Sequence, residues 1–323
     1  MKPNQQELIR RWNDELSRET TLEMVRRKDD RTAAMAAFCE ELASLAPKVS
    51  IRRIKSDDDE LPAIRLLPNL LFHGVPSENE LEPFLEITAA VAQDPAPGDL
   101  ARGELKGLDL PAAIELFVSP QCIHCPAMVR RISPLAIDSK RVLLSIIDAE
   151  LFHDKASEYG IQSVPTLVLD GKFRWNGTVP LADVTRMILS RDPADLSKSA
   201  ILSFLQEGEA DKVAEMMIEH QTVFPALVDL LTHEKWPRRL GAMVAMESLA
   251  EEDPSLASRA APSLLERLDH LTEDVKGDVV YILGEIGGPD LLPALRKIAA
   301  AAGKDSPELA ESAAEAIERI TLK

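Results

Sequence analysis

Cysteine is scarce in this chain, which has three cysteines among 323 residues. So small a number excludes a framework of structural disulfides. Aromatic residues are also few, at 4%, but a hydrophobic content of 45% is enough for packed cores of aliphatic side chains. No apolar run reaches the ~20 residues that a membrane helix needs, and residues 1–7 contain no apolar core of a secretion signal. We therefore expect a globular cytoplasmic protein that binds no membrane.

Basic residues are outnumbered, with 37 lysines and arginines against 54 aspartates and glutamates, so the formal net charge is -17 at pH 7. Phosphate binding needs clustered lysine and arginine. The charge therefore argues against nucleic acid or an anionic membrane as a partner and slightly favours basic partners. The acidic run at residues 57–60 is expected to form a solvated loop.

The most informative motif is a pair of cysteines, Cys122 and Cys125, separated by two residues. A strand-like run precedes the pair at Ala113–Val118, so the thiols are expected at the first turn of a helix. Unpaired backbone N–H groups and the positive end of the helix dipole favour thiolate over thiol at that place. We expect Cys122 to be the nucleophile. Cys125 would then attack a mixed disulfide at Cys122 and release the partner in reduced form.

The same cysteine spacing also occurs in zinc sites. Structural zinc needs four ligands, usually as two such pairs, and the only other cysteine is Cys39, in a distant helix-like segment. The strand and helix pattern around Cys122 and Cys125 is instead typical of a redox motif. We expect redox chemistry, with no metal and no cofactor other than the disulfide of this pair.

The segment from 111 to 192 alternates between strand-like and helix-like runs. The expected order is strand Ala113–Val118, helix Cys122–Leu135, strand Arg141–Asp148, helix Leu151–Tyr159, strands Thr166–Leu169 and Lys172–Asn176, and helix Leu181–Leu189. The dipeptide Asp170-Gly171 is a strong hairpin signal between the last two strands. This order, with the dithiol at the first helix start, resembles the thioredoxin fold.

The thioredoxin resemblance carries an expectation for Val164 and Pro165, which open the third strand. In that family the proline is cis and lies against the thiols, and its missing N–H leaves the neighbouring backbone free to bind substrate. An ordinary trans proline at a strand start is the alternative, since most X-Pro bonds are trans. The motif context favours the cis form.

The N-terminal third of the chain is a divergent copy of this segment. Residues 61–66 match residues 164–169, and residues 21–24 match residues 113–116. Asp30 and Ala33 stand where the cysteines of the second copy stand, so the first copy has no thiol pair. Eleven fewer residues separate its motifs, chiefly where the helix Leu151–Tyr159 should lie. We therefore expect the second helix of the first copy to be short or missing.

Two tandem thioredoxin-like units, of which only the second has thiols, resemble the N-terminal domain of the flavin-containing alkyl hydroperoxide reductase subunit. They also resemble the tandem, glutaredoxin-like protein disulfide oxidoreductases. The resemblance covers roughly residues 1–195. It implies a protein partner, which is a peroxiredoxin in the reductase family and a disulfide or dithiol protein in the other. Because the chain has no G-x-G-x-x-G motif for a dinucleotide, its electron donor or acceptor must be another protein.

Two further residues are candidates for tuning the thiols. Glu115 lies seven residues before Cys122 and matches an acidic residue of the reductase relatives. A partly buried carboxylate there could act as a general base toward Cys125, but Glu23 holds the matching place in the thiol-free copy, which favours a structural role equally. His124, between the cysteines, could stabilise a thiolate at Cys122 when protonated, or be an exposed residue with little effect.

The last 125 residues have few aromatics, and alanine and leucine recur at helical spacing. The expected helices are Ala200–Gln206, Ala210–His220, Phe224–Leu231, Pro237–Glu251, Leu256–Leu268, Val275–Ile286, Leu291–Ala300 and Pro307–Ile320. A weak repeat runs through residues 240–249, 277–286 and 313–320, with steps of 37 and 34 residues, and resembles HEAT-type repeats. Arrays of that type usually bind proteins, although a stabilising or dimerising appendage is the alternative.

The expected domains are a thioredoxin-like unit without redox cysteines at 1–95, a linker at 96–110, a thioredoxin-like unit with the dithiol at 111–196, and a helical HEAT-like domain at 197–323. The expected function is a thiol-disulfide oxidoreductase that exchanges disulfides with a partner protein, which the helical repeats dock. The alternative is a non-enzymatic adaptor whose thioredoxin-like platform and repeats bind partners. An adaptor would not need the dithiol.

Overall fold

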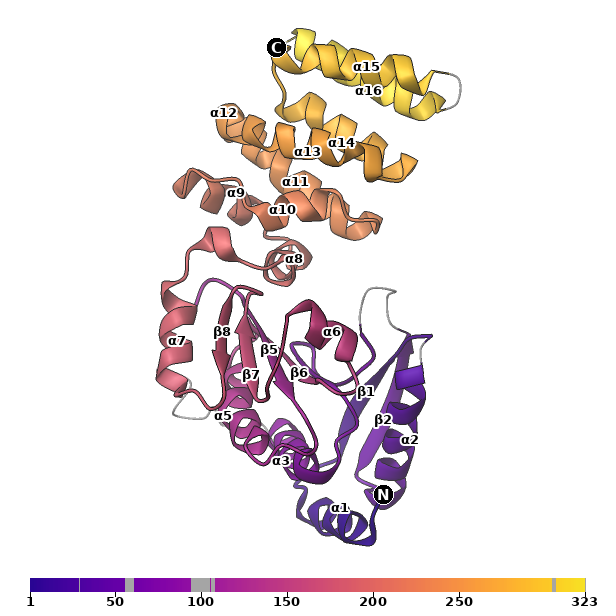
Figure 1. The fold of residues 1–323 in the computed structure, drawn as a ribbon, viewed down its shortest axis with the longest axis vertical. Coiled ribbons are helices and arrows are strands. Elements are labelled where there is room, and N and C mark those ends of the chain that lie inside the picture. Colours follow the sequence, from indigo (N-terminus) through magenta and orange to yellow (C-terminus); the bar gives the residue numbers. More distant parts are fainter. Residues whose placement is uncertain (29, 56–60, 94–104, 106–107, 304–305, 323) are drawn as a thin grey trace. The chain divides into compact units, whose positions relative to one another are not determined.

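The chain is described here by a computed structural model that covers residues 1–28, 30–55, 61–93, 105, 108–303 and 306–322. It divides into two compact units, Met1–Arg191 and Asp192–Lys323. The first contains strands and helices, and the described part of the second is entirely helical (Figure 1). This is the fold class that the sequence predicts. The acidic run at 57–60 and most of the expected linker at 96–110 lie outside the described residues.

The described part of the first unit forms one eight-stranded sheet in the order β2-β1-β3-β4-β6-β5-β7-β8. Its strands are β1 (Thr20–Arg26), β2 (Val49–Lys55), β3 (Ala63–Leu67), β4 (Leu70–His73), β5 (Ala112–Val118), β6 (Val142–Asp148), β7 (Thr166–Leu169) and β8 (Phe173–Asn176). Each half of the sheet has the order second, first, third, fourth strand. The two halves therefore share one topology, as the internal repeat predicts.

The two halves meet where β4 pairs in parallel with β6. Leu70 lies opposite Leu144 and Phe72 lies opposite Ile146. The pairing covers what would otherwise be two exposed sheet edges, each a row of unpaired backbone groups. The two thioredoxin-like units consequently form one continuous sheet, with β4 and β6 at its centre.

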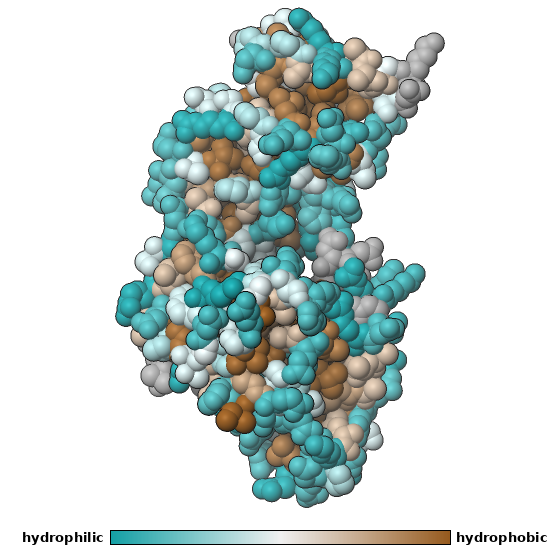
Figure 2. All heavy atoms as spheres, in the orientation of Figure 1, coloured by the Kyte–Doolittle hydropathy of each residue, from teal (hydrophilic) through white to brown (hydrophobic). Residues whose placement is uncertain are grey.

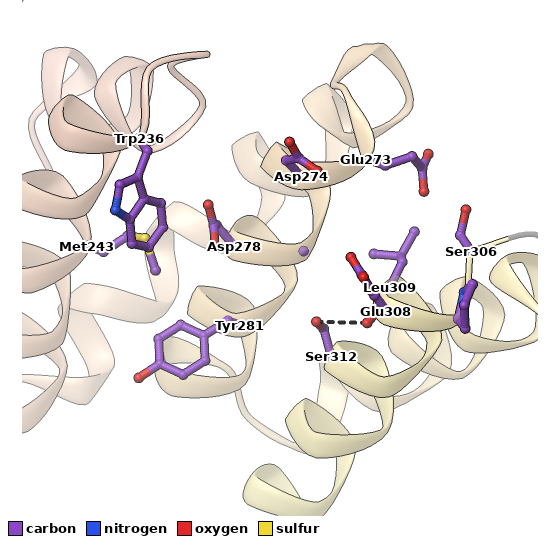
Figure 3. A pocket seen from close by; sticks show the side chains of 12 residues that line it. Trp236, Met243, Glu273, Asp274, Asp278, Tyr281, Ser306, Glu308, Leu309 and Ser312 are labelled. Atoms are coloured by element: carbon purple, nitrogen blue, oxygen red, sulfur yellow. Dashed lines mark hydrogen bonds between the residues drawn. The ribbon is translucent and has the colours of Figure 1, made fainter.

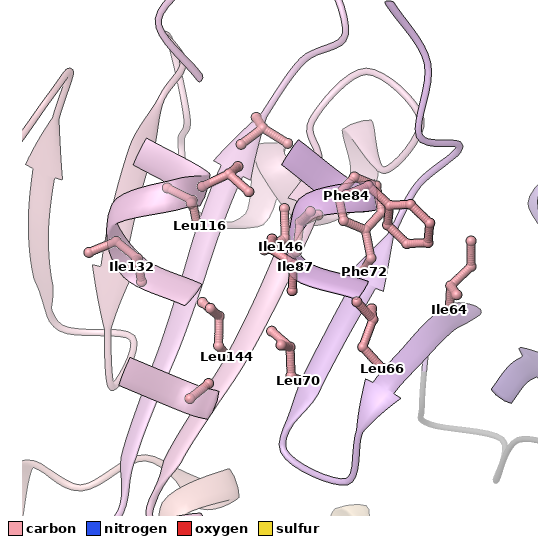
Figure 4. Close-up of a cluster of buried hydrophobic side chains, with 14 of the residues drawn as sticks. Ile64, Leu66, Leu70, Phe72, Phe84, Ile87, Leu116, Ile132, Leu144 and Ile146 are labelled. Carbon is pink, nitrogen blue, oxygen red and sulfur yellow. The ribbon is translucent and has the colours of Figure 1, made fainter. Parts of the chain in front are cut away.

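Helices α2 (Asp30–Leu45), α3 (Leu81–Ala92) and α5 (Cys125–Asp138) cover one face of this sheet. Successive residues of a strand point to opposite faces, so alternate side chains such as Phe72, Leu116 and Ile146 gather on that face. They pack against Phe84 of α3 and Ile132 of α5 (Figure 4). This apolar cluster fixes α5, and hence the dithiol, on the sheet.

The other helices of the first unit are α1 (Pro3–Glu15), α6 (His153–Glu158) and α7 (Leu181–Ser190). The sequence interpretation did not include α1. No helix occurs among the described residues between β2 and β3. That observation agrees with the prediction that the first copy has a short or missing second helix.

The second unit consists of short helices that match the predicted segments, except that the predicted helix Leu256–Leu268 is interrupted at Ser258–Ala260 and gives two shorter α-helices. They are α8 (Lys198–Gln206), α9 (Ala210–Glu219), α10 (Pro225–Leu231), α11 (Trp236–Glu252), α12 (Pro254–Ala257), α13 (Ala261–Arg267), α14 (Glu273–Ile286), α15 (Leu292–Ala302) and α16 (Pro307–Leu322). Over this unit, hydrophobic residues show as patches between hydrophilic ones (Figure 2). The HEAT-type assignment stays a prediction. Among the residues described, none of the helices is both long and apolar enough to cross a membrane.

Candidate dithiol site

Cys122 and Cys125 form a disulfide, with their Cα atoms 5.5 Å apart. The expected helix start at Cys122 is wrong by three residues, because α5 begins at Cys125 and His124 is its N-cap. Pro126 explains the difference. A proline is favoured at the first positions of a helix, but in a helix that began at Cys122 its ring would lie in the second turn and crowd the preceding carbonyl.

Cys122 lies just before α5, and its sulfur is close enough to accept a hydrogen bond from the start of that helix. Its Sγ accepts the backbone N–H of Cys125 at 3.0 Å, which is one of the N–H groups that a helix start leaves without a partner. The backbone N–H of Cys122 donates to Ser119 O at 3.0 Å, which fixes the loop after β5. Hydrogen bonding to a sulfur stabilises its negative form, so this geometry favours a thiolate at Cys122.

The two sulfurs differ in their access to solvent. Cys122 is half-buried, whereas Cys125 is fully buried, at 0% exposure. A partner protein can therefore reach Cys122 but not Cys125. Ile123, between them, is 76% exposed, so an apolar side chain projects beside the accessible sulfur.

Val164 and Pro165, which directly precede β7, lie beside the dithiol. The peptide bond between the two residues is cis, as the motif context predicts. The carbonyl oxygen of Val164 lies 3.6 Å from Cys122 Sγ. The structure thus brings four of the six predicted site residues together, namely the two cysteines, Val164 and Pro165.

The other two predicted site residues, His124 and Glu115, make no hydrogen bond to either sulfur in the described part of the chain. His124 is exposed and its side chain does not cap the helix. Glu115 is on the face of the sheet opposite to that of Leu116, where its Oε1 pairs with Lys155 Nζ of α6 at 3.5 Å. Burial, together with Glu115 nearby, raises the pKa of Tyr159, which hydrogen-bonds Glu115. Glu115 therefore has structural partners of its own.

The matching residue of the thiol-free copy is engaged in a similar way. Glu23 lies opposite Arg52 on β2 and opposite Arg65 on β3. Its carboxylate pairs with both, with Arg65 Nη1 at 3.2 Å. The hydrogen bond from Arg52, with smaller contributions from both positive charges, lowers the pKa of Glu23. An ion pair at this sheet position exists in both copies, with or without thiols.

Sequence reasoning missed a second acidic residue, Glu80, which lies close to the dithiol loop. Because β4, β5 and β6 run parallel, the loops that follow them share one edge of the sheet. At this edge the N–H of Asn79 donates to Pro120 O at 3.2 Å. Glu80 comes from the first copy, so only the pairing of β4 with β6 reveals its proximity.

Glu80 has the environment of a proton carrier. It is 1% exposed, and neither carboxylate oxygen has a hydrogen-bond partner among the described residues. Burial and, to a smaller extent, the nearby carboxylate of Asp148 raise the pKa of Glu80 to about 8, against the opposing effect of Arg130. A carboxyl group with a pKa near neutrality can both accept and return a proton.

The third cysteine lies away from the dithiol. Cys39 is buried in α2, and burial raises the pKa of its thiol to about 12, so it is not a reactive thiol. Within the described ranges, no group of three or more histidine, cysteine, aspartate or glutamate side chains is arranged to hold a metal ion.

A cysteine pair whose second member begins a helix, opposite a cis-proline that directly precedes a neighbouring strand, defines a thioredoxin-type dithiol unit. The family model of the thioredoxin domain matches residues 112–190. The thioredoxin of Methanocaldococcus jannaschii is 42% identical over 65 residues, which are 20% of this chain and 76% of that protein. The chain belongs to the thioredoxin family.

Two further comparisons extend beyond the dithiol unit. A subunit of the alkyl hydroperoxide reductase of Staphylococcus epidermidis is 23% identical over 176 residues, which are 52% of this chain. The chain spans about a third of the length of that reductase (34%). A protein disulfide oxidoreductase from Aeropyrum pernix K1 has the same fold, with a TM-score of 0.52 and 17% identity over 58% of this chain and 92% of that one. These comparisons confirm the predicted resemblances to the alkyl hydroperoxide reductase subunit and to the protein disulfide oxidoreductases.

Proposed function

We propose that the chain is a thiol-disulfide oxidoreductase that exchanges disulfides with a partner protein. The observation that carries the proposal is the placement of Cys122. Its sulfur is accessible, accepts an N–H group at the start of α5 and lies 3.6 Å from Val164 O, with the buried Cys125 bonded to it. The thioredoxin, reductase and disulfide oxidoreductase relatives support an oxidoreductase of this kind.

The exchange takes two steps. The Cys122 thiolate attacks one sulfur of the partner disulfide, which forms a mixed disulfide and releases the other sulfur of the partner as a thiolate. Cys125 then loses its proton to Glu80 and attacks Cys122 Sγ, which breaks the mixed disulfide. The partner leaves as a dithiol and the chain keeps the Cys122–Cys125 disulfide, which a second, electron-donating protein must reduce. The reverse sequence oxidises a partner dithiol.

The partner backbone is held by the strand start during these steps. Val164 O points to the sulfur that becomes attached to the partner, so it can accept an N–H from an extended segment beside the partner cysteine. Ile123, which follows Cys122 and is exposed, offers an apolar contact to the partner. In this proposal Cys122, Cys125, Val164 and Pro165 form the exchange site.

The substitution Cys125→Ser tests the proposal directly. Without the second thiol the mixed disulfide cannot be resolved, so the reduced variant should accumulate covalent adducts with its partner in a cell extract. Non-reducing electrophoresis followed by mass spectrometry would detect adducts attached at Cys122. The double variant Cys122→Ser/Cys125→Ser is the control, and it should form none. Adducts that persist in the double variant, or no adducts with Cys125→Ser, would contradict the mechanism.

The assignment of proton transfer to Glu80 predicts a change in pH dependence. In the wild type, resolution of the mixed disulfide should accelerate with pH up to about 8, because the Glu80 carboxylate becomes available as its proton leaves. In Glu80→Gln this rise should disappear and the rate at pH 8 should fall at least ~10-fold, since general base catalysis contributes about 10²–10⁴-fold. Stopped-flow kinetics of the resolution step measure both.

Stability gives a second readout for Glu80 that does not depend on the reaction. Its folded pKa lies above the ordinary value of 4.5, so the folded state retains a proton that the unfolded chain has lost. The free energy of unfolding therefore falls as pH rises from about 4.5 to about 8, and by neutral pH the fall is about 3 kcal/mol. The variant Glu80→Gln should not show this fall. Glu115→Gln is the matched control. If Glu115→Gln, and not Glu80→Gln, flattens the rate profile, Glu115 is the base.

A further inference from the structure

The helical unit contains a groove of about 630 Å³ between α11, α14 and α16. These helices carry the three segments of the internal sequence repeat. Trp236 and Met243 of α11 face Asp278 and Tyr281 of α14 across the groove (Figure 3). Its volume is in the range of pockets that bind small ligands, and it could hold a few side chains of a peptide. It suits a short peptide segment and not a whole domain.

The rim of the groove is acidic. Four carboxylates line it, from Glu273, Asp274, Asp278 and Glu308, and no lysine or arginine is among the described lining residues. Asp278 pairs with Arg239 at 2.5 Å, and Glu273 pairs with a lysine of its own helix at 2.9 Å. Asp274 and Glu308 face the groove without a basic partner among the described residues. The two helix N-termini contribute only about half a positive charge each, so the rim keeps a negative potential.

The floor of the groove is apolar and aromatic. Trp236 is 48% exposed, and Met243 of the same helix, Tyr281 of α14 and Leu309 of α16 also line the groove. Both aromatic rings already bind a cation of the chain itself. The Arg239 guanidinium lies 5.5 Å from the Trp236 ring centroid, and the Arg319 guanidinium lies 4.9 Å from that of Tyr281. Since one face of each ring holds its own arginine, the exposed surface of Trp236 can hold an aliphatic or cationic side chain of another molecule.

We propose that this groove binds a segment of the partner protein in which a lysine or arginine flanks an apolar side chain. The apolar side chain would pack on Trp236, and the basic one would reach Asp274 and Glu308. The inference rests on the proposed function, in which the exchange partner is a protein. It adds a second attachment point, which would raise the local concentration of the partner disulfide at Cys122.

Binding can be tested with the full chain and a fluorescein-labelled decapeptide whose core is lysine-leucine-leucine-lysine between glycine and serine residues. Fluorescence anisotropy should show saturable binding that weakens as salt is added. Two matched peptides separate the contributions. Replacing the lysines by glutamates, or the leucines by serines, should weaken binding by at least ~10-fold, because each removes one of the two kinds of contact.

Variants of the chain assign the binding to the groove. Trp236→Ala should weaken binding about 10-fold, as expected when an aromatic anchor is removed. The double variant Asp274→Asn/Glu308→Gln should weaken it several-fold and reduce its salt dependence. Glu215→Gln, an exposed acidic position on α9 away from the groove, is the control and should bind as the wild type does.

The inference is overturned if the basic peptide does not bind, if the acidic peptide binds equally well, or if the groove variants bind like the wild type. Reduction of insulin by the Cys122–Cys125 dithiol, with dithiothreitol as electron donor, is measured on the same samples. Intact exchange with failed peptide binding removes the groove proposal alone. Failed exchange with intact peptide binding removes the oxidoreductase proposal and leaves the groove as a binding site.

Discussion

Replacing Cys122 by alanine should abolish disulfide exchange with a protein substrate, lowering kcat/KM by at least about 10³-fold, the order of loss expected when a covalent nucleophile is removed. The reason is access. Cys125 is fully buried and cannot reach a partner disulfide, so no second thiol can replace the lost one. Because Cys122→Ala also prevents formation of the disulfide, the variant should show two free thiols by alkylation and mass spectrometry.

Insulin reduction and reduction of a small aromatic disulfide together measure this loss. Cys39→Ala is the matched control, since it also removes one thiol. Burial raises the pKa of Cys39 to about 12, so its thiol is neither ionised nor accessible, and the variant should keep wild-type rates. A Cys122→Ala protein that retains more than a tenth of the wild-type rate would show that the dithiol is not the reacting group.

The parts of the site that could be predicted from the sequence have short-range signals. The cysteine pair follows a strand-like run directly, and Asp170-Gly171 supplies the two residues with positive φ that the hairpin turn needs. The cis bond before Pro165, forty residues after Cys125, was predictable only from the resemblance to the thioredoxin fold, in which this proline lies against the thiols. The helix start that the cysteine spacing predicts is three residues too early, because Pro126 favours the first turn of the helix.

The parts that could not be predicted depend on contacts between distant segments. Nothing in β4 or β6 taken alone indicates that they pair, because each is an apolar strand that would fit beside several others. Without that pairing, Glu80 is an acidic residue of a surface-like loop in the thiol-free copy. Its burial beside Asp148 and the dithiol loop follows only when both halves of the sheet are assembled.

The ion pair between Asp170 and Arg191 is another long-range feature, and its loss should have the largest effect on stability. Arg191 Nε lies 2.9 Å from Asp170 Oδ2, and both side chains are 0% exposed. The guanidinium also donates to the carbonyls of Leu110, Pro111 and Ile188. Burial lowers the pKa of Arg191, and Asp170 opposes this. The pair ties the β7–β8 turn and the end of α7 to the start of β5, the strand that leads to the dithiol.

Arg191→Met should therefore lower the free energy of unfolding of the first unit by about 3–5 kcal/mol, because it leaves the Asp170 carboxylate buried without a counter-charge. Urea denaturation followed by the fluorescence of Trp12 and Trp175, in a Trp236→Phe background, measures this unit. The double variant Asp170→Asn/Arg191→Met should recover part of the loss, since it buries no unpaired charge. Arg186→Met, which breaks the exposed pair with Asp183 on the same helix, should cost no more than ~0.5 kcal/mol. Equal losses for the buried and exposed pairs would mean that the buried pair does not hold the turn, the helix end and the strand together.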